Sequence, residues 1–422
     1  MQRIFNAGKY NYIFFILLLW SLNIYFYKPN RDHWQSYLFQ FAKKVVPSSP
    51  NQNLRQSLKL YDLRRTSSNS DDLISTTQRS IYTIYDMIFT TINYFNSSIS
   101  ILIVIFFIIT GILIILANTS FLLLVFRYGK DKLSLLIFFF LIIPIEIFAN
   151  FFNKGQSVLI WNKYINNESE INTYNLFSLL FEHIKILILP SSHYSVFGLE
   201  PRNLVLLIFT IYYLEYYILR KNNPLLLISL AFIHLPTAIL IKVILLFDNM
   251  IQTRKFNREK SLLMAMLTNS IVYFLFTEHF GIYIVIFFIV SNLLIINKVQ
   301  KNKYFADLKL GTSFMVWGLF GIIIILFTAI SFYYNMQEVI SSPYWFSSSL
   351  IELSGRYFSV FRIIFLILIS TQLYRIFLTT ELKGINIHFT PFSSKINIYF
   401  MICTVTIFVT TIKMFELYLF TK

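Results

Sequence analysis

The feature that most constrains this chain is a series of apolar runs long enough to cross a lipid bilayer. Among them are the runs from Ile99 to Phe126, from Leu133 to Phe152 and from Ile396 to Phe420. Spanning a hydrocarbon core of about 30 Å takes about 20 helical residues. Because nothing in that core hydrogen-bonds an exposed backbone, runs of this kind satisfy their own amide groups as helices. We therefore predict an all-α fold, a polytopic transmembrane helical bundle.

Composition agrees with a membrane protein. Hydrophobic residues make up 56% of the 422 residues, charged residues only 13%, and the mean hydropathy is +0.62. In a soluble domain about a quarter of the residues are charged. The formal net charge is +16, but Lys and Arg lie in short loops between the apolar runs, where they determine topology rather than form one nucleic-acid-binding face. We therefore expect membrane lipid, and no nucleic acid, as a partner.

Motifs for bound cofactors are absent from the sequence. It contains no P-loop, no GxGxxG fingerprint and no HExxH or DxD spacing, which are the patterns that hold nucleotides and metal ions. Cys403, the one cysteine, lies inside an apolar run, so neither an intrachain disulfide nor a cysteine-based metal cluster can form. We expect no cofactor and assign no metal site.

The first apolar run, from Tyr12 to Tyr27, follows two basic residues and lacks a small-residue cleavage site. That pattern predicts an uncleaved signal-anchor helix in residues 1–27, with the N-terminus in the cytoplasm. Residues 28–98 are polar, and we expect a long outer loop that contains an interfacial helix. Residues 99–422 then form the transmembrane bundle. The chain is thus predicted to be a single integral, multi-pass domain of the plasma (inner) membrane.

Basic segments set the order of the remaining crossings. Four of them are predicted to be cytoplasmic: residues 127–132, 220–221, 254–260 and 298–309. The run 225–247 lies between two of these segments and is split by Pro236, so we expect a helical hairpin that turns at residues 234–237. Residues 333–356 are predicted to be an outer loop. About nine full crossings result, or nine to eleven membrane helices when the hairpin and the interfacial helices are included.

Polar side chains suggest where a functional site lies. Glu146 falls inside the apolar run 133–152, and a carboxylate at that depth must face a partner or a cavity. Elsewhere the polar residues concentrate in the predicted outer turns. There a carboxylate or histidine can deprotonate a hydroxyl group, and an arginine can hold a phosphate through two hydrogen bonds. We therefore expect a site at the outer membrane face.

Three features follow one another in the middle of the chain: a helix that begins at Pro201 and Arg202, a basic turn, and an apolar rise broken by Leu-Pro-Thr at 235–237. In this order they resemble the polytopic GT-C type glycosyltransferases, in which His-Pro or Thr-Pro stands at the break. The resemblance implies a membrane glycosyltransferase that moves a hexosyl group from a polyprenyl-phosphate-linked donor to an acceptor at the outer face. Such an enzyme serves the synthesis of a cell-envelope polysaccharide, and the lipid-linked sugar donor is its further partner.

The resemblance also implies a catalytic base in the first outer loop, and Asp32, with His33 beside it, occupies that position. The alternative role for Asp32 is helix capping, since Asp is a common N-cap residue. Arg202 either clamps a phosphate or anchors the start of its helix at the headgroup level. The candidate substrate-binding residues are Arg202, Glu200, His193, His234, Glu278, His279 and Arg356.

Two other functions remain open. A Wzy-like polysaccharide polymerase or O-antigen ligase has a similar length and number of crossings. Its largest outer loop usually falls late in the chain, however, whereas the longest polar segment here is 28–98. A lipid or small-molecule transporter more often contains internal repeats and many membrane glycines, and only 11 glycines occur here. Glycosyl transfer is therefore the function that we favour.

Overall fold

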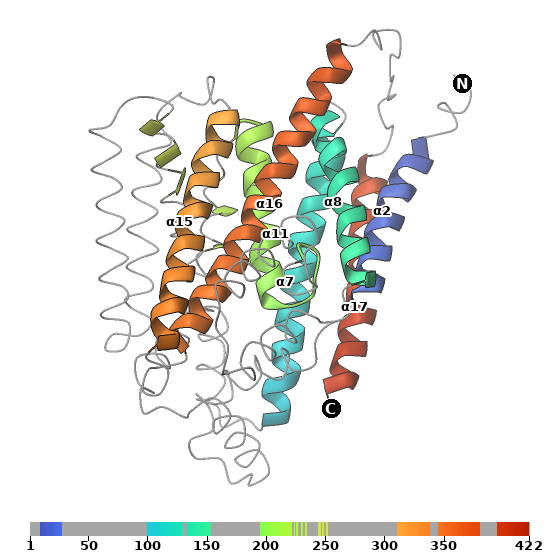
Figure 1. Cartoon of the computed structure of the whole chain (residues 1–422). Helices are drawn as coiled ribbons and strands as arrows, with labels where there is room; N and C mark the ends of the chain where they lie inside the picture. The colour runs from blue at the N-terminus through green and yellow to red at the C-terminus, as the bar shows by residue number, and fades with distance from the viewer. Residues whose placement is uncertain are drawn as a thin grey trace. The chain divides into compact units, whose positions relative to one another are not determined.

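The computed structural model describes residues 9–27, 99–129, 133–152, 195–221, 310–337, 345–379 and 395–421, together with scattered positions between 223 and 251. All the regular structure in these ranges is helical. In chain order the helices are α2 (Lys9–Phe26), α7 (Ile99–Tyr128), α8 (Leu133–Phe152), α11 (Pro201–Tyr213), η2 (Leu214–Ile218), α15 (Leu310–Gln337), α16 (Trp345–Thr379) and α17 (Lys395–Thr421) (Figure 1). The short η2 segment is a π-helical turn that continues α11.

Four of these helices contain stretches long and apolar enough to cross a membrane. The stretches are Val104–Tyr128, Leu133–Asn150, Ser359–Ile376 and Ile398–Leu419. Large apolar side chains point outward from them: on α17, Phe400, Phe408 and Phe415 are 73%, 65% and 60% exposed. Side chains at this spacing lie on one face of a helix. An exposed apolar face of this kind is expected where a helix contacts lipid. The described part is therefore that of a helical membrane protein, while much of the predicted set of nine to eleven membrane helices lies outside the described residues.

Most helix boundaries follow the apolar runs closely, but the prediction of a loop at 333–356 is wrong. The helix α15 continues to Gln337, and α16 begins at Trp345, so most of that segment is helical. The reason can be seen in the sequence after Pro343, where Phe346, Leu350 and Leu353 recur at helical spacing. No proline interrupts α16 after that point.

The chain divides into two compact units. Unit 1 contains residues 1–30, 107–222 and 358–422, and unit 2 contains residues 31–106 and 223–357. In unit 2, the Ser313 hydroxyl donates a 2.6 Å hydrogen bond to the Asp248 carboxylate, and both side chains are buried. The buried charged groups that suggest a function, Glu146 and Arg362, belong to unit 1.

Within unit 1, α2 packs against α8 and α17, and α8 packs against η2. The helices α2 and α8 run side by side in Figure 1. Polar and aromatic contacts join α7 to α17: the Thr119 and Thr406 hydroxyl groups lie 2.8 Å apart, and the rings of Phe107 and Tyr418 meet edge to face. Helices distant in sequence are thus held together by side chains that suit a lipid environment, where small polar groups join helices.

Candidate functional site

The first helix, α2, is joined to its neighbours by buried polar side chains. Trp20 Nε1 donates a 2.8 Å hydrogen bond to Asn118 Oδ1 on α7. One turn further along α2, Asn23 Oδ1 accepts a 3.0 Å hydrogen bond from Asn150 Nδ2 on α8. Asn23 Nδ2 and Asn150 Oδ1 have no hydrogen-bond partner among the described residues, so this amide pair retains one donor and one acceptor. A helix predicted to be a signal anchor is therefore also an integral part of the bundle.

A buried ion pair lies beside α2. Arg362 Nη2 of α16 donates to Glu146 Oε1 of α8 at 2.6 Å, and the two side chains are 1% and 0% exposed. Moving either charge out of water is costly, and the cost is offset only when the partner and further hydrogen bonds are in place. The expectation that Glu146 faces a partner is confirmed.

The second oxygen of Glu146 holds a turn that precedes α11. Ser195 Oγ donates to Glu146 Oε2, and the backbone N–H of Val196 donates to the same oxygen at 3.2 Å. Both oxygens of the carboxylate therefore accept hydrogen bonds, one from α16 and one from the turn at residues 195–200. A carboxylate held from two sides in this way is fixed in place, which suits it to positioning the turn.

Asn203 locks the other side of that turn. Its Nδ2 donates to the Ser195 carbonyl oxygen at 2.7 Å, while its Oδ1 accepts from the Glu200 N–H at 3.0 Å and from the Tyr27 hydroxyl at 3.2 Å. Glu200 is the N-cap residue of α11 and Pro201 follows it at the first helical position. Proline suits this position because its missing N–H would have no partner within the helix.

Gly198 leaves room for the Asn203 side chain. A Cβ atom at position 198 would lie 2.3 Å from both Cγ and Oδ1 of Asn203 and 2.7 Å from Nδ2. These distances are shorter than real contacts, and the clash would fall on a side chain that is itself held by three hydrogen bonds. Only glycine therefore fits the turn without displacing Asn203.

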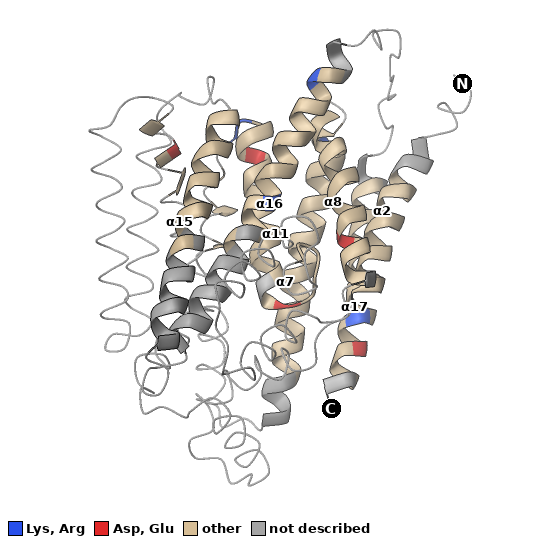
Figure 2. Ribbon diagram, in the orientation of Figure 1, with Lys and Arg blue, Asp and Glu red and all other residues tan. Residues whose placement is uncertain are grey.

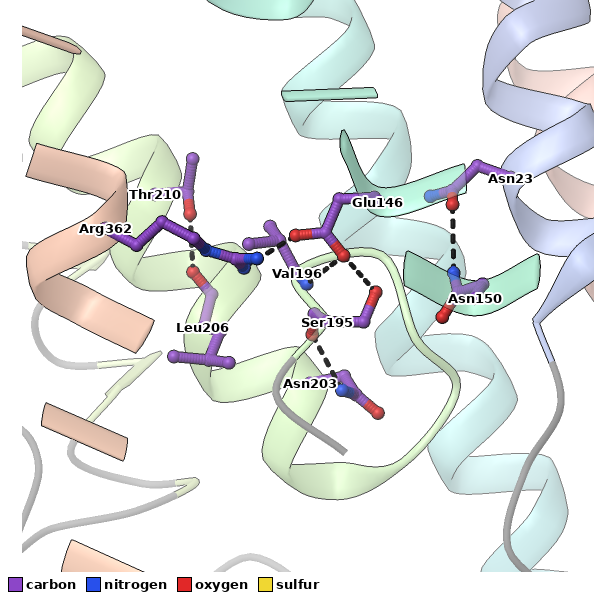
Figure 3. A network of polar contacts seen from close by, with 9 residues as sticks. All are labelled: Asn23, Glu146, Asn150, Ser195, Val196, Asn203, Leu206, Thr210 and Arg362. Carbon is purple, nitrogen blue, oxygen red and sulfur yellow. Dashed lines mark hydrogen bonds and ion pairs between the residues drawn. The ribbon is translucent and has the colours of Figure 1, made fainter. Parts of the chain in front are cut away.

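We call Tyr27, Glu146, Ser195, Asn203 and Arg362 the buried polar cluster. All five side chains are at most 1% exposed. Figure 3 shows four of them together, with Arg362 on one side of Glu146, the turn on the other, and the Asn23 and Asn150 amides close by. Two helices, α8 and α16, and the turn thus meet at the Glu146 carboxylate.

The structure brings one of the candidate residues predicted from sequence into this arrangement. Glu200 is buried at the start of α11. Arg202 is the second residue of α11 and Arg356 lies within α16, but their side chains are outside the described part. Also outside it are Asp32, His33, His193, His234, Glu278 and His279. The roles assigned to all of these residues stay predictions.

Arg362 is the residue that sequence reasoning missed. Its signal is nonetheless present, because it is a charged residue within the apolar stretch Ser359–Ile376, and ionisable residues at membrane depth mark either partners or function. Asn203 and Ser195 carried no such signal, since isolated amides and hydroxyls are common at helix ends and in turns. Among the described residues, no group of three His, Cys, Asp or Glu side chains is placed to hold a metal ion.

No protein-family model matches this chain, and no curated protein or solved structure is similar to it. What the buried polar cluster can do therefore follows from its chemistry. It contains a carboxylate whose two oxygens are engaged, a hydroxyl that ties the turn to this carboxylate, a carboxamide that ties the turn to the start of α11, and a guanidinium that compensates the charge of the carboxylate. This arrangement is suited to holding the start of α11 in one position.

Proposed function

We propose that this chain is a membrane glycosyltransferase of GT-C type. It moves a glycosyl group from a polyprenyl-phosphate-linked donor to a hydroxyl acceptor at the outer face of the membrane. The observation that carries the proposal is the Glu146 carboxylate, which binds Arg362 inside the membrane helices and the Ser195 turn at the same time. Ionisable residues at this depth are costly and usually mark a functional site.

The location of the cluster agrees with an outer-face site. Glu146 lies 13 residues after the first residue of α8, Leu133, which corresponds to about 20 Å along a helix. The start of α8 adjoins the basic segment 127–132, which the positive-inside rule places in the cytoplasm. The cluster therefore belongs to the opposite end of α8, the end expected to face outward.

The cluster positions the first turn of α11 for substrate. In our proposal Arg202, the second residue of α11, holds the donor phosphate, because a guanidinium at a helix N-terminus combines two attractions for an anion. Glu146, Arg362, Ser195 and Asn203 act through the turn as positioning residues. The other candidates for binding the sugar or the acceptor are His193, Glu200, His234, Glu278, His279 and Arg356.

The proposed reaction is a single displacement at the anomeric carbon. Asp32, next to His33, accepts the proton of the acceptor hydroxyl while the oxygen of that hydroxyl forms a bond to the anomeric carbon. The bond from the anomeric carbon to the phosphate oxygen breaks, and the electron pair leaves with polyprenyl phosphate. Arg202 compensates the charge that develops on the departing phosphate.

The test uses the purified full chain with a polyprenyl-phosphate-linked sugar and a hydroxyl acceptor, and it detects the new glycoside by mass spectrometry. Arg202→Lys keeps the charge but loses the planar two-point fork, so we expect product formation to fall about tenfold or more at normal protein level. Asp32→Asn should nearly abolish product, since Asn caps a helix as well as Asp but accepts no proton. Lys413→Gln is a control, because Lys413 pairs with Glu416 on α17; it should leave the rate unchanged.

The products distinguish the alternatives. One added glycosyl group supports the proposal, whereas a ladder of repeat units would assign the chain to the Wzy-like polymerases and ligases. Transport of an intact lipid-linked sugar without any new glycosidic bond would show a transporter. Full activity in both Arg202→Lys and Asp32→Asn would remove these residues from the mechanism.

A further inference from the structure

A second set of charged side chains lies at the other end of unit 1. Arg127 is at the end of α7, Arg220 and Lys221 follow η2, and Arg375 lies near the end of α16. We call these four residues the basic cluster. Figure 2 shows Lys and Arg gathered near the upper ends of α11 and α16. All four side chains are exposed, in contrast to the buried Arg362.

Tyr128 brings two of these cations together. Lys221 Nζ donates a 2.8 Å hydrogen bond to the Tyr128 hydroxyl and lies 4.4 Å from the centre of its ring. The Arg127 guanidinium carbon lies 5.2 Å from the same ring centre. Both cations therefore contact the same ring, and residues from the ends of two helices share one aromatic side chain.

Arg220 occupies an unusual backbone conformation. Its φ angle is 55°, the one positive value at a non-glycine residue among the described residues. The chain turns back here, with the Lys221 N–H donating to the Glu215 carbonyl oxygen at 2.9 Å and the Leu219 N–H to that of Leu214 at 3.2 Å. Glycine is the usual residue at such a helix end. Arg220 therefore occupies a position at which the backbone conformation alone would favour glycine.

Arg375 adds a like charge from a third helix. Loss of hydration beside the protein lowers the pKa of the Arg220 guanidinium, the Tyr216 and Tyr217 hydroxyl groups act in the opposite direction, and the positive charge of Arg375 lowers it further. The ends of α7, η2 and α16 thus each contribute positive charge to the basic cluster, and the negative ends of the helix dipoles favour cations at these positions.

The ends of the apolar stretches show at which level the basic cluster lies. The membrane-length stretches end at Tyr128 on α7 and at Ile376 on α16, and the shorter apolar helix ends at Ile218. The basic cluster thus lies at the boundary of the apolar zone on three helices, the level at which headgroups and interfacial tyrosines are found. This is also the end that carries the basic segments predicted to be cytoplasmic.

We propose that the basic cluster binds the phosphate of an anionic phospholipid headgroup, with the Tyr128 ring in contact with both Arg127 and Lys221. This site is separate from the outer-face site and does not depend on glycosyl transfer. The phosphate is part of a lipid rather than a free anion, because the cluster borders the apolar stretches of three helices on which acyl chains can lie.

The experiment adds dioleoylphosphatidylglycerol or dioleoylphosphatidylcholine to the purified full chain and counts bound lipid by native mass spectrometry. Wild-type protein should prefer phosphatidylglycerol. Arg375→Gln should lower that affinity about fivefold, since each basic residue near an anionic surface contributes to binding by roughly that factor. Arg220→Asn should do the same while it keeps the backbone conformation, because Asn tolerates positive φ.

Two controls separate binding from folding. Arg375→Lys keeps the charge and should keep the preference. Lys413→Gln removes a cation that is already paired, with Nζ 2.8 Å from Glu416 Oε2, and should also leave the preference intact. Equal phosphatidylglycerol affinity in wild type, Arg375→Gln and Arg220→Asn would overturn the proposal. So would binding of inorganic phosphate as tight as that of the lipid, which would assign the site to a free anion.

Discussion

Two arginines on one helix lie in very different environments at the two ends of unit 1. Arg362 and Arg375 both belong to α16, about 20 Å apart along a helix. Arg362 is 1% exposed and bonded to Glu146, whereas Arg375 is exposed and lies near Arg220, a residue of the same charge. An arginine within an apolar helix therefore needs a carboxylate from another helix, while one at the end of the helix can remain hydrated and face headgroups.

The difference also separates two kinds of polar structure. In the buried polar cluster each group is held by others, and its members come from residues as far apart in the chain as Tyr27 and Arg362. The basic cluster is held mainly by local backbone and by Tyr128. We therefore expect substitutions at the first to affect folding and substitutions at the second to affect binding.

The largest effect should follow the removal of Arg362. Arg362→Met leaves the Glu146 carboxylate buried without its guanidinium, and breaking a buried pair in this way lowers the free energy of unfolding by about 3–5 kcal/mol. The matched change at the other end, Arg375→Met, should alter it by less than about 0.5 kcal/mol. Unfolding in mixed SDS micelles measures both values. Similar losses for the two variants would contradict the difference in environment between Arg362 and Arg375.

A smaller loss is expected when the turn is overfilled. Gly198→Ala places a methyl group against Asn203, so the free energy of unfolding should fall by about 1–3 kcal/mol. Gly311→Ala is the control, because a Cβ there meets nothing within 4 Å; in the first turn of α15 it should be neutral or stabilise by up to about 1 kcal/mol. If Gly198→Ala is tolerated as well as Gly311→Ala, then Asn203 is not held as described.

Loss of one hydrogen bond from α2 should be weaker still. Trp20→Phe removes the donor to Asn118 Oδ1, and hydrogen bonds between membrane helices contribute about 0.6 kcal/mol on average. Tyr25→Phe, at a side chain that is 69% exposed, should change the free energy of unfolding by less than this. The same unfolding titration compares them, and a larger loss from Tyr25→Phe would contradict the buried role of α2.

No loss of stability is expected at Arg220, where stability and lipid binding should change in opposite directions. Arg220→Gly relieves a positive φ angle, so the protein should be unchanged or more stable by up to about 1 kcal/mol. Its affinity for phosphatidylglycerol should fall about fivefold. Parallel losses of stability and binding would show that the basic cluster is structural.

Apolar runs predicted the helices well because a bilayer constrains length and composition together. The helix α8 has the same bounds as its predicted run, Leu133 to Phe152, and α17 differs from its run by one residue at each end. The error at residues 333–356 arose because Trp345 to Arg356 is polar enough to suggest a loop, although its apolar residues keep helical spacing. The polarity of a segment indicates whether it contacts water or lipid, whereas the spacing of its apolar residues indicates whether it is helical.

The site was harder to predict because its contacts join distant parts of the chain. The depth of Glu146 in an apolar run indicated that it has a partner, but nothing local selected Arg362, which is 216 residues away. The role of Gly198 likewise depends on where Asn203 points. Such pairings depend on how the helices pack, and a single sequence does not show which residues of two helices come into contact.

A double-mutant cycle can measure directly whether Glu146 pairs with Arg362. Glu146→Gln, Arg362→Gln and the double variant would be unfolded under the same conditions as wild type. Residues in direct contact couple by about 0.5–3 kcal/mol, whereas distant ones add within about 0.5 kcal/mol. We predict a coupling of at least about 2 kcal/mol, with the double variant more stable than the sum of the single losses implies; strictly additive losses would contradict the pair.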